Sequence, residues 1–202
     1  MSWDFLLTSL IVVLLPGTGV IYTLSVGMFR GAWASVAAAF GCTLGIVPHI
    51  AASILGLAAL LHASAVAFQV VKYAGVVYLL YLAWSVWRDT GALNLSRPEP
   101  MATTKTIVRG FLINILNPKL SVFFLSFLPQ FVPLGSAHAT RDMLVLAAVF
   151  MAMTFVVFVG YGVSATAVGA RLAGSPRATR WMQRSFAAAF AAFGVKLALQ
   201  ER

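Results

Sequence analysis

Six runs of apolar residues, each close to the length of a membrane-spanning helix, follow one another along the chain. They cover residues 5–28, 33–61, 67–87, 110–132, 142–170 and 185–200. About 20 apolar residues in helical form cross the hydrocarbon core of a bilayer. The pattern therefore predicts an all-α polytopic membrane protein with about six transmembrane helices. We expect the first run to be a retained span, because no basic stretch of the secretory-signal type precedes it.

The first and fourth runs are each interrupted by a proline, and the two prolines lie about half the chain apart. Pro16 breaks the first run and Pro118 breaks the fourth. Three spans in each half would make the halves run in opposite directions through the membrane. Such inverted repeats with broken helices are typical of secondary transporters. We predict one integral membrane domain over 1–202, with repeat one at about 1–87, a linker at about 88–109 and repeat two at about 110–202.

Polar residues gather where the fourth run is broken. Asn114, Asn117 and Lys119 lie beside Pro118 in an otherwise apolar segment. Polar and ionisable groups are costly in hydrocarbon, so they usually face a cavity or a pathway. Proline also leaves a backbone carbonyl one turn earlier without its donor. The cluster predicts a site for a small polar solute.

In this hypothesis the asparagine amides bind a zwitterionic solute, and Lys119 pairs with its carboxylate. The broken first run, at Pro16 and Gly17, forms the other half of the site. Backbone carbonyls freed beside the two prolines accept the solute's ammonium. The alternative is that asparagine and lysine only join helices, as polar side chains in membrane bundles do.

His49, next to Pro48, is the only histidine deep inside a run. Imidazole titrates near neutral pH, so His49 is a candidate for proton transfer. Burial disfavours the charged form of an ionisable side chain, so Lys119 could also release and regain a proton. Pro48 also predicts a kink in the second run, and the alternative for His49 is that it caps carbonyls freed by this kink.

The charges bear on topology rather than on nucleic acid. Hydrophobic residues make up 61% of the chain and charged residues 9%, with a net charge of +9. The loops after runs one, three and five hold nine basic residues, namely Arg30, Arg88, Arg97, Lys105, Arg109, Arg171, Arg177, Arg180 and Arg184. The other side holds four, namely Lys72, Arg141, Lys196 and Arg202. The positive-inside rule predicts cytoplasmic odd loops, both termini outside, and contact with anionic lipid.

The groups that most enzymes need are missing from the runs. All five acidic residues lie in loops or near run ends, and Cys42 is the only cysteine. We therefore expect no metal, no cofactor and no enzyme activity. Small residues at Ala37, Gly41 and Gly45 predict close helix contacts, within the chain or in a homodimer.

These motifs resemble the lysine-exporter (LysE/RhtB) superfamily of bacterial amino-acid exporters. The resemblance covers essentially the whole chain and is carried by Gly41-Cys-Thr-Leu-Gly45, Gly110-Phe-Leu-Ile-Asn-Ile-Leu-Asn-Pro-Lys119, Phe127-Leu-Pro-Gln-Phe131 and Phe193-Gly-Val-Lys-Leu-Ala198. It implies a multi-pass exporter in the inner membrane that expels amino acids or their derivatives, driven by an ion gradient. The family often reads Pro-Gly-Pro-Asn in the first span, whereas this chain has Pro16-Gly-Thr-Gly19.

We therefore expect proton-driven efflux of an amino acid or a related metabolite. Two alternatives remain at this point. One is a passive pore or flippase-like protein that uses the same cavity. The other is an intramembrane enzyme, against which the missing carboxylate pair argues.

Overall fold

The chain folds into helices, and its described part contains no strand. The computed structural model describes residues 2–15, 17–63, 101–132 and 138–172, single positions between 70 and 84, and residues 184 and 188. The described elements are α1 (Trp3–Leu14), α2 (Thr18–Arg30), α3 (Ala32–Leu44), α4 (Val47–Ala63), α6 (Thr103–Ile115), α7 (Pro118–Phe127), a 3-10 turn at Leu128–Phe131, and α8 (Ala139–Leu172). Most of runs 67–87 and 185–200 lies outside the described residues.

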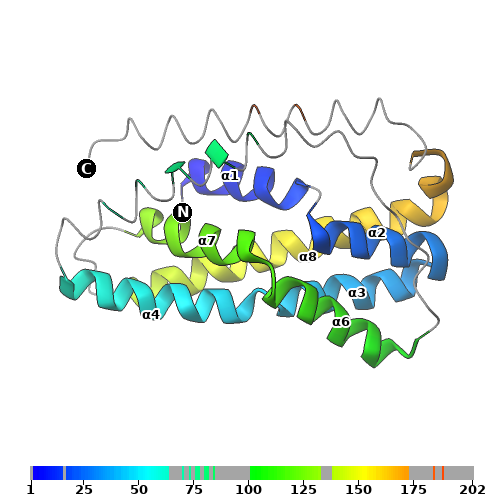
Figure 1. Ribbon diagram of the computed structural model, residues 1–202, viewed down its shortest axis with the longest axis horizontal. Helices are drawn as coiled ribbons and strands as arrows, with labels where there is room; N and C mark the ends of the chain where they lie inside the picture. The colour runs from blue at the N-terminus through cyan, green and yellow to red at the C-terminus, as the bar shows by residue number, and fades with distance from the viewer. Residues whose placement is uncertain are drawn as a thin grey trace.

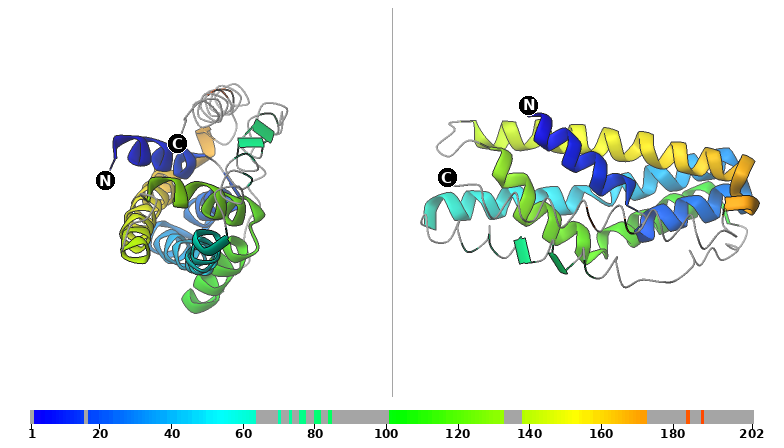
Figure 2. Two further views of the ribbon diagram at one scale, coloured as in Figure 1. Left: turned by 90° about the vertical axis from the view of Figure 1, so that its left-hand side faces the viewer. Right: turned by 90° about the horizontal axis from the view of Figure 1, so that it is seen from above.

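The helices lie along one long axis and form a bundle (Figures 1 and 2). The 34-residue α8 runs almost the whole length of the molecule. Its last turns lie at the same end as the α2–α3 turn (Figure 1). The other described helices are shorter because three of the apolar runs are interrupted.

Each interruption falls close to a proline. The first run bends by 55° between α1 and α2, where Pro16 itself lies outside the described residues. The fourth run breaks after Ile115, and α7 starts at Pro118. The second run breaks at Gly45 and Ile46, just before Pro48. The breaks predicted from these prolines are therefore confirmed.

Two continuous helical stretches are long and apolar enough to cross a membrane. Ala32–Gly56, which includes the α3–α4 turn, has a mean hydropathy of 1.7, and Ala139–Ala167 has 2.6. The bent pair α1 and α2 adds a third candidate among the described residues. Helix α6 begins at Thr103, inside the segment 88–109 that the sequence predicts as a linker. The first turns of α6 consist mainly of polar residues, so the apolar run that starts at residue 110 does not reveal where the helix begins.

Glycines allow the broken helices to pack backbone to backbone. A Cβ on Gly41 of α3 would overlap the carbonyl oxygen of Ile107 on α6. A Cβ on Gly27 of α2 would likewise overlap the carbonyl oxygen of Gly162 on α8. The predicted small-residue face of α3 is thus used within the chain. Small residues are the usual means of close helix approach in membranes.

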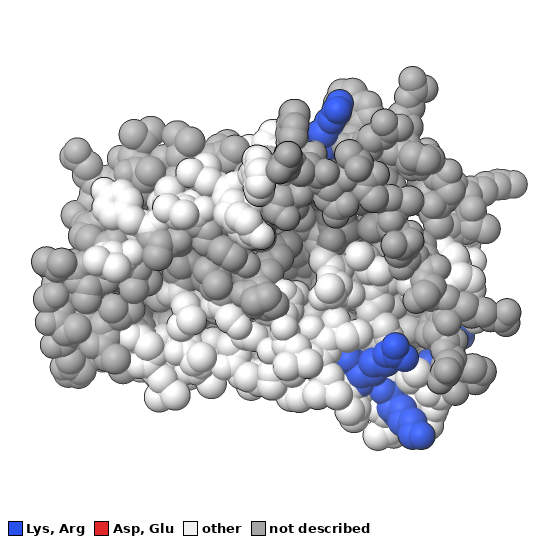
Figure 3. Space-filling view, viewed as in Figure 1, with Lys and Arg blue, Asp and Glu red and all other residues white. Residues whose placement is uncertain are grey.

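Basic side chains gather at the end of the bundle that holds the start of α6 (Figure 3). Arg30 at the end of α2 donates to Thr106 Oγ1 at 2.8 Å and to the Met101 carbonyl. Tyr22 donates to the Thr106 carbonyl at 3.0 Å, and Arg109 lies 6.0 Å from the Tyr22 ring centroid. These contacts fasten α2 to α6 at this end.

Candidate functional site

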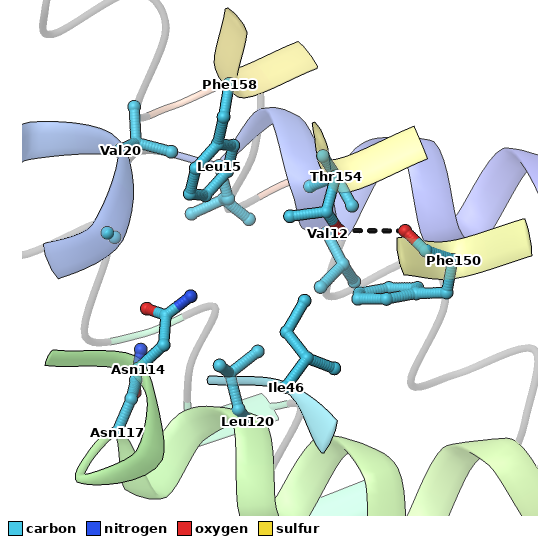
Figure 4. A pocket seen from close by; sticks show the side chains of 13 residues that line it. Val12, Leu15, Val20, Ile46, Asn114, Asn117, Leu120, Phe150, Thr154 and Phe158 are labelled. Carbon is cyan, nitrogen blue, oxygen red and sulfur yellow. Dashed lines mark hydrogen bonds between the residues drawn. The ribbon is translucent and has the colours of Figure 1, made fainter. Parts of the chain in front are cut away.

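The three helix breaks meet at one cavity of about 40 Å³ (Figure 4). By the same measure one water needs roughly 10–15 Å³, so the cavity has room for about three water molecules. Leu15 and Gly17 come from the first break, Ile46 from the second, and Asn114 and Asn117 from the third. Helix α8, which has no break, closes the remaining side. The chain thus places its irregular backbone around a hollow, as membrane proteins require.

Asn114 is a deeply buried polar residue in the cavity wall. Its side chain is 3% exposed, and its Nδ2 donates to the Cys42 carbonyl at 2.7 Å. Its Oδ1 faces Gly19, where an added Cβ would lie only 2.7 Å away. No described residue donates a hydrogen bond to this Oδ1. Asn114 therefore joins α6 to α3, as the helix-joining alternative predicts, and still offers one acceptor at the cavity.

His49 supplies the donor that Pro118 cannot. Because proline has no N–H, the Asn114 carbonyl lacks the donor four residues on, and the Asn117 N–H donates to it instead at 3.0 Å. His49 Nε2 lies 2.9 Å from that carbonyl oxygen, and Ser121 Oγ lies 3.0 Å from Nδ1. A carbonyl only accepts, so Nε2 carries the hydrogen; in the neutral tautomer Nδ1 would then accept from the Ser121 hydroxyl. His49 does not line the cavity; it contacts the backbone of the lining residue Asn114.

At the break between α1 and α2, a side chain also donates a hydrogen bond to a backbone carbonyl. Tyr161 on α8 donates to the Leu14 carbonyl at 2.9 Å, at the end of α1. Asn117 Nδ2 lies 3.4 Å from Thr18 Oγ1, a long contact that links the third break to the first. The carbonyls of Leu14 and Asn114 thus already accept side-chain donors. A ligand would have to compete with these donors at the two carbonyls, and binding of the ammonium by other carbonyls at the breaks stays a prediction.

The start of α2 presents unpaired donors beside the cavity. Helix α2 begins after Gly17 with no side-chain cap, and its first backbone bond runs from Ile21 to Gly17. The N–H groups of Thr18, Gly19 and Val20 therefore have no partner among the described residues. The end of a helix where such groups gather carries partial positive charge and favours anions.

The structure brings together only part of the predicted site. Gly17, Asn114 and Asn117 line the cavity. Pro16 and the side chains of Pro118 and Lys119 lie outside the described residues. The backbone of Lys119 is in the first turn of α7, directly before the cavity residue Leu120.

Sequence reasoning missed the wall that α8 contributes. Phe150, Thr154 and Phe158 are spaced four residues apart, so they share one face of the helix, and all three line the cavity. They lie in a uniformly apolar run, where no proline or polar cluster marks a particular face. Thr18 was also missed, because a threonine before an apolar helix is ordinary. The described lining contains no charged side chain, and the described residues contain no group of three metal-ligating side chains.

Comparison with known proteins gives the same family over the same span. The model of the LysE type translocator family matches residues 10–201. The chain is 31% identical over 198 residues to the homoserine/homoserine lactone efflux protein of Salmonella typhi, covering 96% of this chain and 94% of that protein. It is 29% identical over 167 residues to the leucine efflux protein of Enterobacter sp. strain 638, covering 78% of each.

A membrane protein of Vibrio cholerae without an assigned activity is 32% identical over 195 residues, with 96% of this chain and 94% of that protein covered. No solved structure matches the chain.

Proposed function

Because the chain belongs to the LysE type translocator family, we propose that it is a carrier that exports amino acids or their derivatives across the bacterial inner membrane. Relatives of nearly the same length are named as efflux proteins for homoserine, homoserine lactone and leucine. The observation that carries the proposal is the cavity at the three helix breaks. Among the described residues it combines an amide oxygen and helix-start N–H groups that have no partner there with an apolar wall.

The two ends of a zwitterion would find different partners in this site. The free N–H groups at the start of α2 suit a carboxylate, and Lys119 would add a full positive charge from the first turn of α7. Asn114 Oδ1, to which no described residue donates, suits the ammonium. This assignment gives the ammonium a different partner from the backbone carbonyls of the sequence-based hypothesis, because Tyr161 and His49 already bond to the carbonyls of Leu14 and Asn114.

We infer that export is coupled to proton entry through Lys119, with His49 as a lesser candidate. A substrate carboxylate would stabilise the charged form of Lys119, and this links substrate binding to proton binding. His49 has a hydrogen-bond partner at each ring nitrogen, and in the neutral tautomer Nδ1 accepts from Ser121. Protonation would force the Ser121 hydroxyl to turn, because Nδ1 would then donate. Rocking of two inverted halves about the cavity would expose it to either side in turn.

The central test is transport by the purified protein in liposomes. Labelled amino acids should accumulate against a gradient when a pH difference is imposed, and unlabelled substrate inside should drive counterflow. Asn114→Ala and Asn117→Ala should abolish both while the protein still inserts. Flux without counterflow would identify a passive pore, and transport by the alanine variants at the normal rate would remove the cavity from the pathway.

Lys119→Arg tests the coupling step separately. Arginine keeps the positive charge but does not release its proton in proteins. We expect Lys119→Arg to catalyse exchange of substrate at near the normal rate and to lose its response to an imposed pH gradient. Efflux and exchange would be measured in the same liposomes. Uphill efflux with an unchanged pH response would show that Lys119 is not the coupling residue.

A further inference from the structure

We propose that Val12, Ile46 and Phe150 form the side-chain pocket of the carrier, and that this pocket selects neutral amino acids with aliphatic side chains. The inference rests on the proposed function and names the substrate class of the same cavity. It depends on which residues form each side of the hollow.

The cavity is polar on one side and apolar on the other. Asn114 and Asn117 lie together on the side of the α6–α7 break (Figure 4). Val12, Ile46 and Phe150 lie across the hollow from them (Figure 4). A ligand whose charged groups occupy the polar side must therefore direct its side chain at the apolar group.

The apolar side offers no hydrogen-bond donor to a polar side chain. Thr154, the polar residue nearest this side, donates its hydroxyl proton to the Phe150 carbonyl at 2.8 Å. Burying a polar or charged group without a matching partner is costly. No described charged residue in the lining could compensate a lysine-like or glutamate-like ligand. Relative to an aliphatic side chain, the pocket therefore strongly disfavours a charged side chain and more weakly disfavours one with a hydroxyl group.

The pocket is also held rigidly in shape. Phe150 is 2% exposed, and its ring centroid lies 5.0 Å from that of Phe124 and 5.4 Å from that of Phe123. Ile46 is 1% exposed in the turn between α3 and α4. Close packing on the far side leaves these walls little room to retreat. Branched aliphatic side chains of moderate size fit such a pocket better than aromatic rings do.

Competition in counterflow tests the substrate class on the wild-type carrier. Entry of labelled leucine would be measured against unlabelled leucine, isoleucine and norvaline, and against homoserine, threonine, lysine and glutamate. We expect the aliphatic amino acids to compete about tenfold or more better than homoserine and threonine, the range that small apolar differences give in a hydrophobic pocket. Lysine and glutamate should not compete.

Val12→Thr then tests the pocket itself, since threonine has the shape of valine and adds a hydroxyl. Its preference for leucine over homoserine should fall several-fold. Val26→Thr is the matched control, because Val26 is fully buried on α2 and does not line the cavity. Its preference should stay at the wild-type value.

Outcomes separate the two proposals. If homoserine or lysine competes best in the wild type, the aliphatic pocket is wrong and amino-acid export still stands. If both valine variants keep the wild-type preference, Val12 is not part of the pocket. If no amino acid drives counterflow, the proposed function itself fails.

Discussion

Gly19 is a single residue on which the geometry of the site depends. Its missing side chain leaves the space into which Asn114 Oδ1 projects, and Phe158 closes the same space from α8. Asn114 cannot simply turn away, because its Nδ2 is bonded to the Cys42 carbonyl. The start of α2 therefore contributes backbone rather than a side chain to this part of the wall.

Gly19→Ala should impair transport without preventing folding. The new Cβ would lie 2.7 Å from Asn114 Oδ1 and 3.0 Å from Phe158, so the amide must shift. A hydrogen bond to a charged group contributes about 1.5–3 kcal/mol, so substrate binding should weaken about tenfold or more. Binding would be measured on the purified protein. Gly160→Ala is the control, because a Cβ there meets nothing within 4 Å; equal behaviour of the two variants would contradict the role of Gly19.

His49 should matter to stability through Nε2 rather than through its charge. We expect His49→Leu to lower the free energy of unfolding by about 1 kcal/mol, since the Asn114 carbonyl loses its side-chain donor but keeps the Asn117 N–H. In His49→Gln an amide N–H can replace Nε2, so stability should largely return. Unfolding in detergent measures both variants. Loss of the pH response in His49→Gln would move the coupling role from Lys119 to His49.

At the scale of elements, the sequence predicted where the helices break better than which helix faces line the cavity. Proline and its lost N–H are visible in the sequence, so the breaks near Pro48 and Pro118 could be predicted from it. The face of α8 that meets the cavity could not, because its apolar residues are alike on every side. Which carbonyl each donor would reach also depended on packing: His49 bonds a carbonyl 65 residues away.

Added volume at the contact between α3 and α6 should reduce the stability of the protein. Gly41→Ala would push a methyl group into the Ile107 carbonyl, and overpacking of a tight interface costs about 1–3 kcal/mol. We expect a lower unfolding temperature in detergent. Gly56→Ala on α4 is the matched control, since its nearest neighbour, Leu125 Cδ2, lies at 3.4 Å. If Gly41→Ala is as stable as the control, α3 and α6 are less tightly joined than described.

For the whole molecule, the distribution of basic residues predicts its orientation. Arg30 and the start of α6 lie at one end of the bundle, where Arg30 holds Thr106. His138, just before α8, lies at the opposite end of that helix from its last turns. From the positive-inside rule we predict that the end with Arg30 is cytoplasmic and that both termini are outside.

Single cysteines on a Cys42→Ser background test this orientation. In intact cells, Ser96→Cys in the loop 88–109 should resist impermeant thiol reagents, whereas His138→Cys should react readily. Permeabilised cells supply the control, because both positions should then react. Labelling of Ser96→Cys from outside together with protection of His138→Cys would reverse the topology.

The unbroken length of α8 links the protein to the thickness of its bilayer. Its apolar stretch Ala139–Ala167 has 29 residues, about 43 Å at ~1.5 Å per residue, against a hydrocarbon core of about 30 Å. A helix this long must tilt strongly or protrude. The three interrupted runs can adjust at their breaks, whereas α8 has no such joint. Lipids with longer acyl chains would therefore relieve the mismatch at α8 first, and chain length becomes a physical variable that acts on one wall of the cavity.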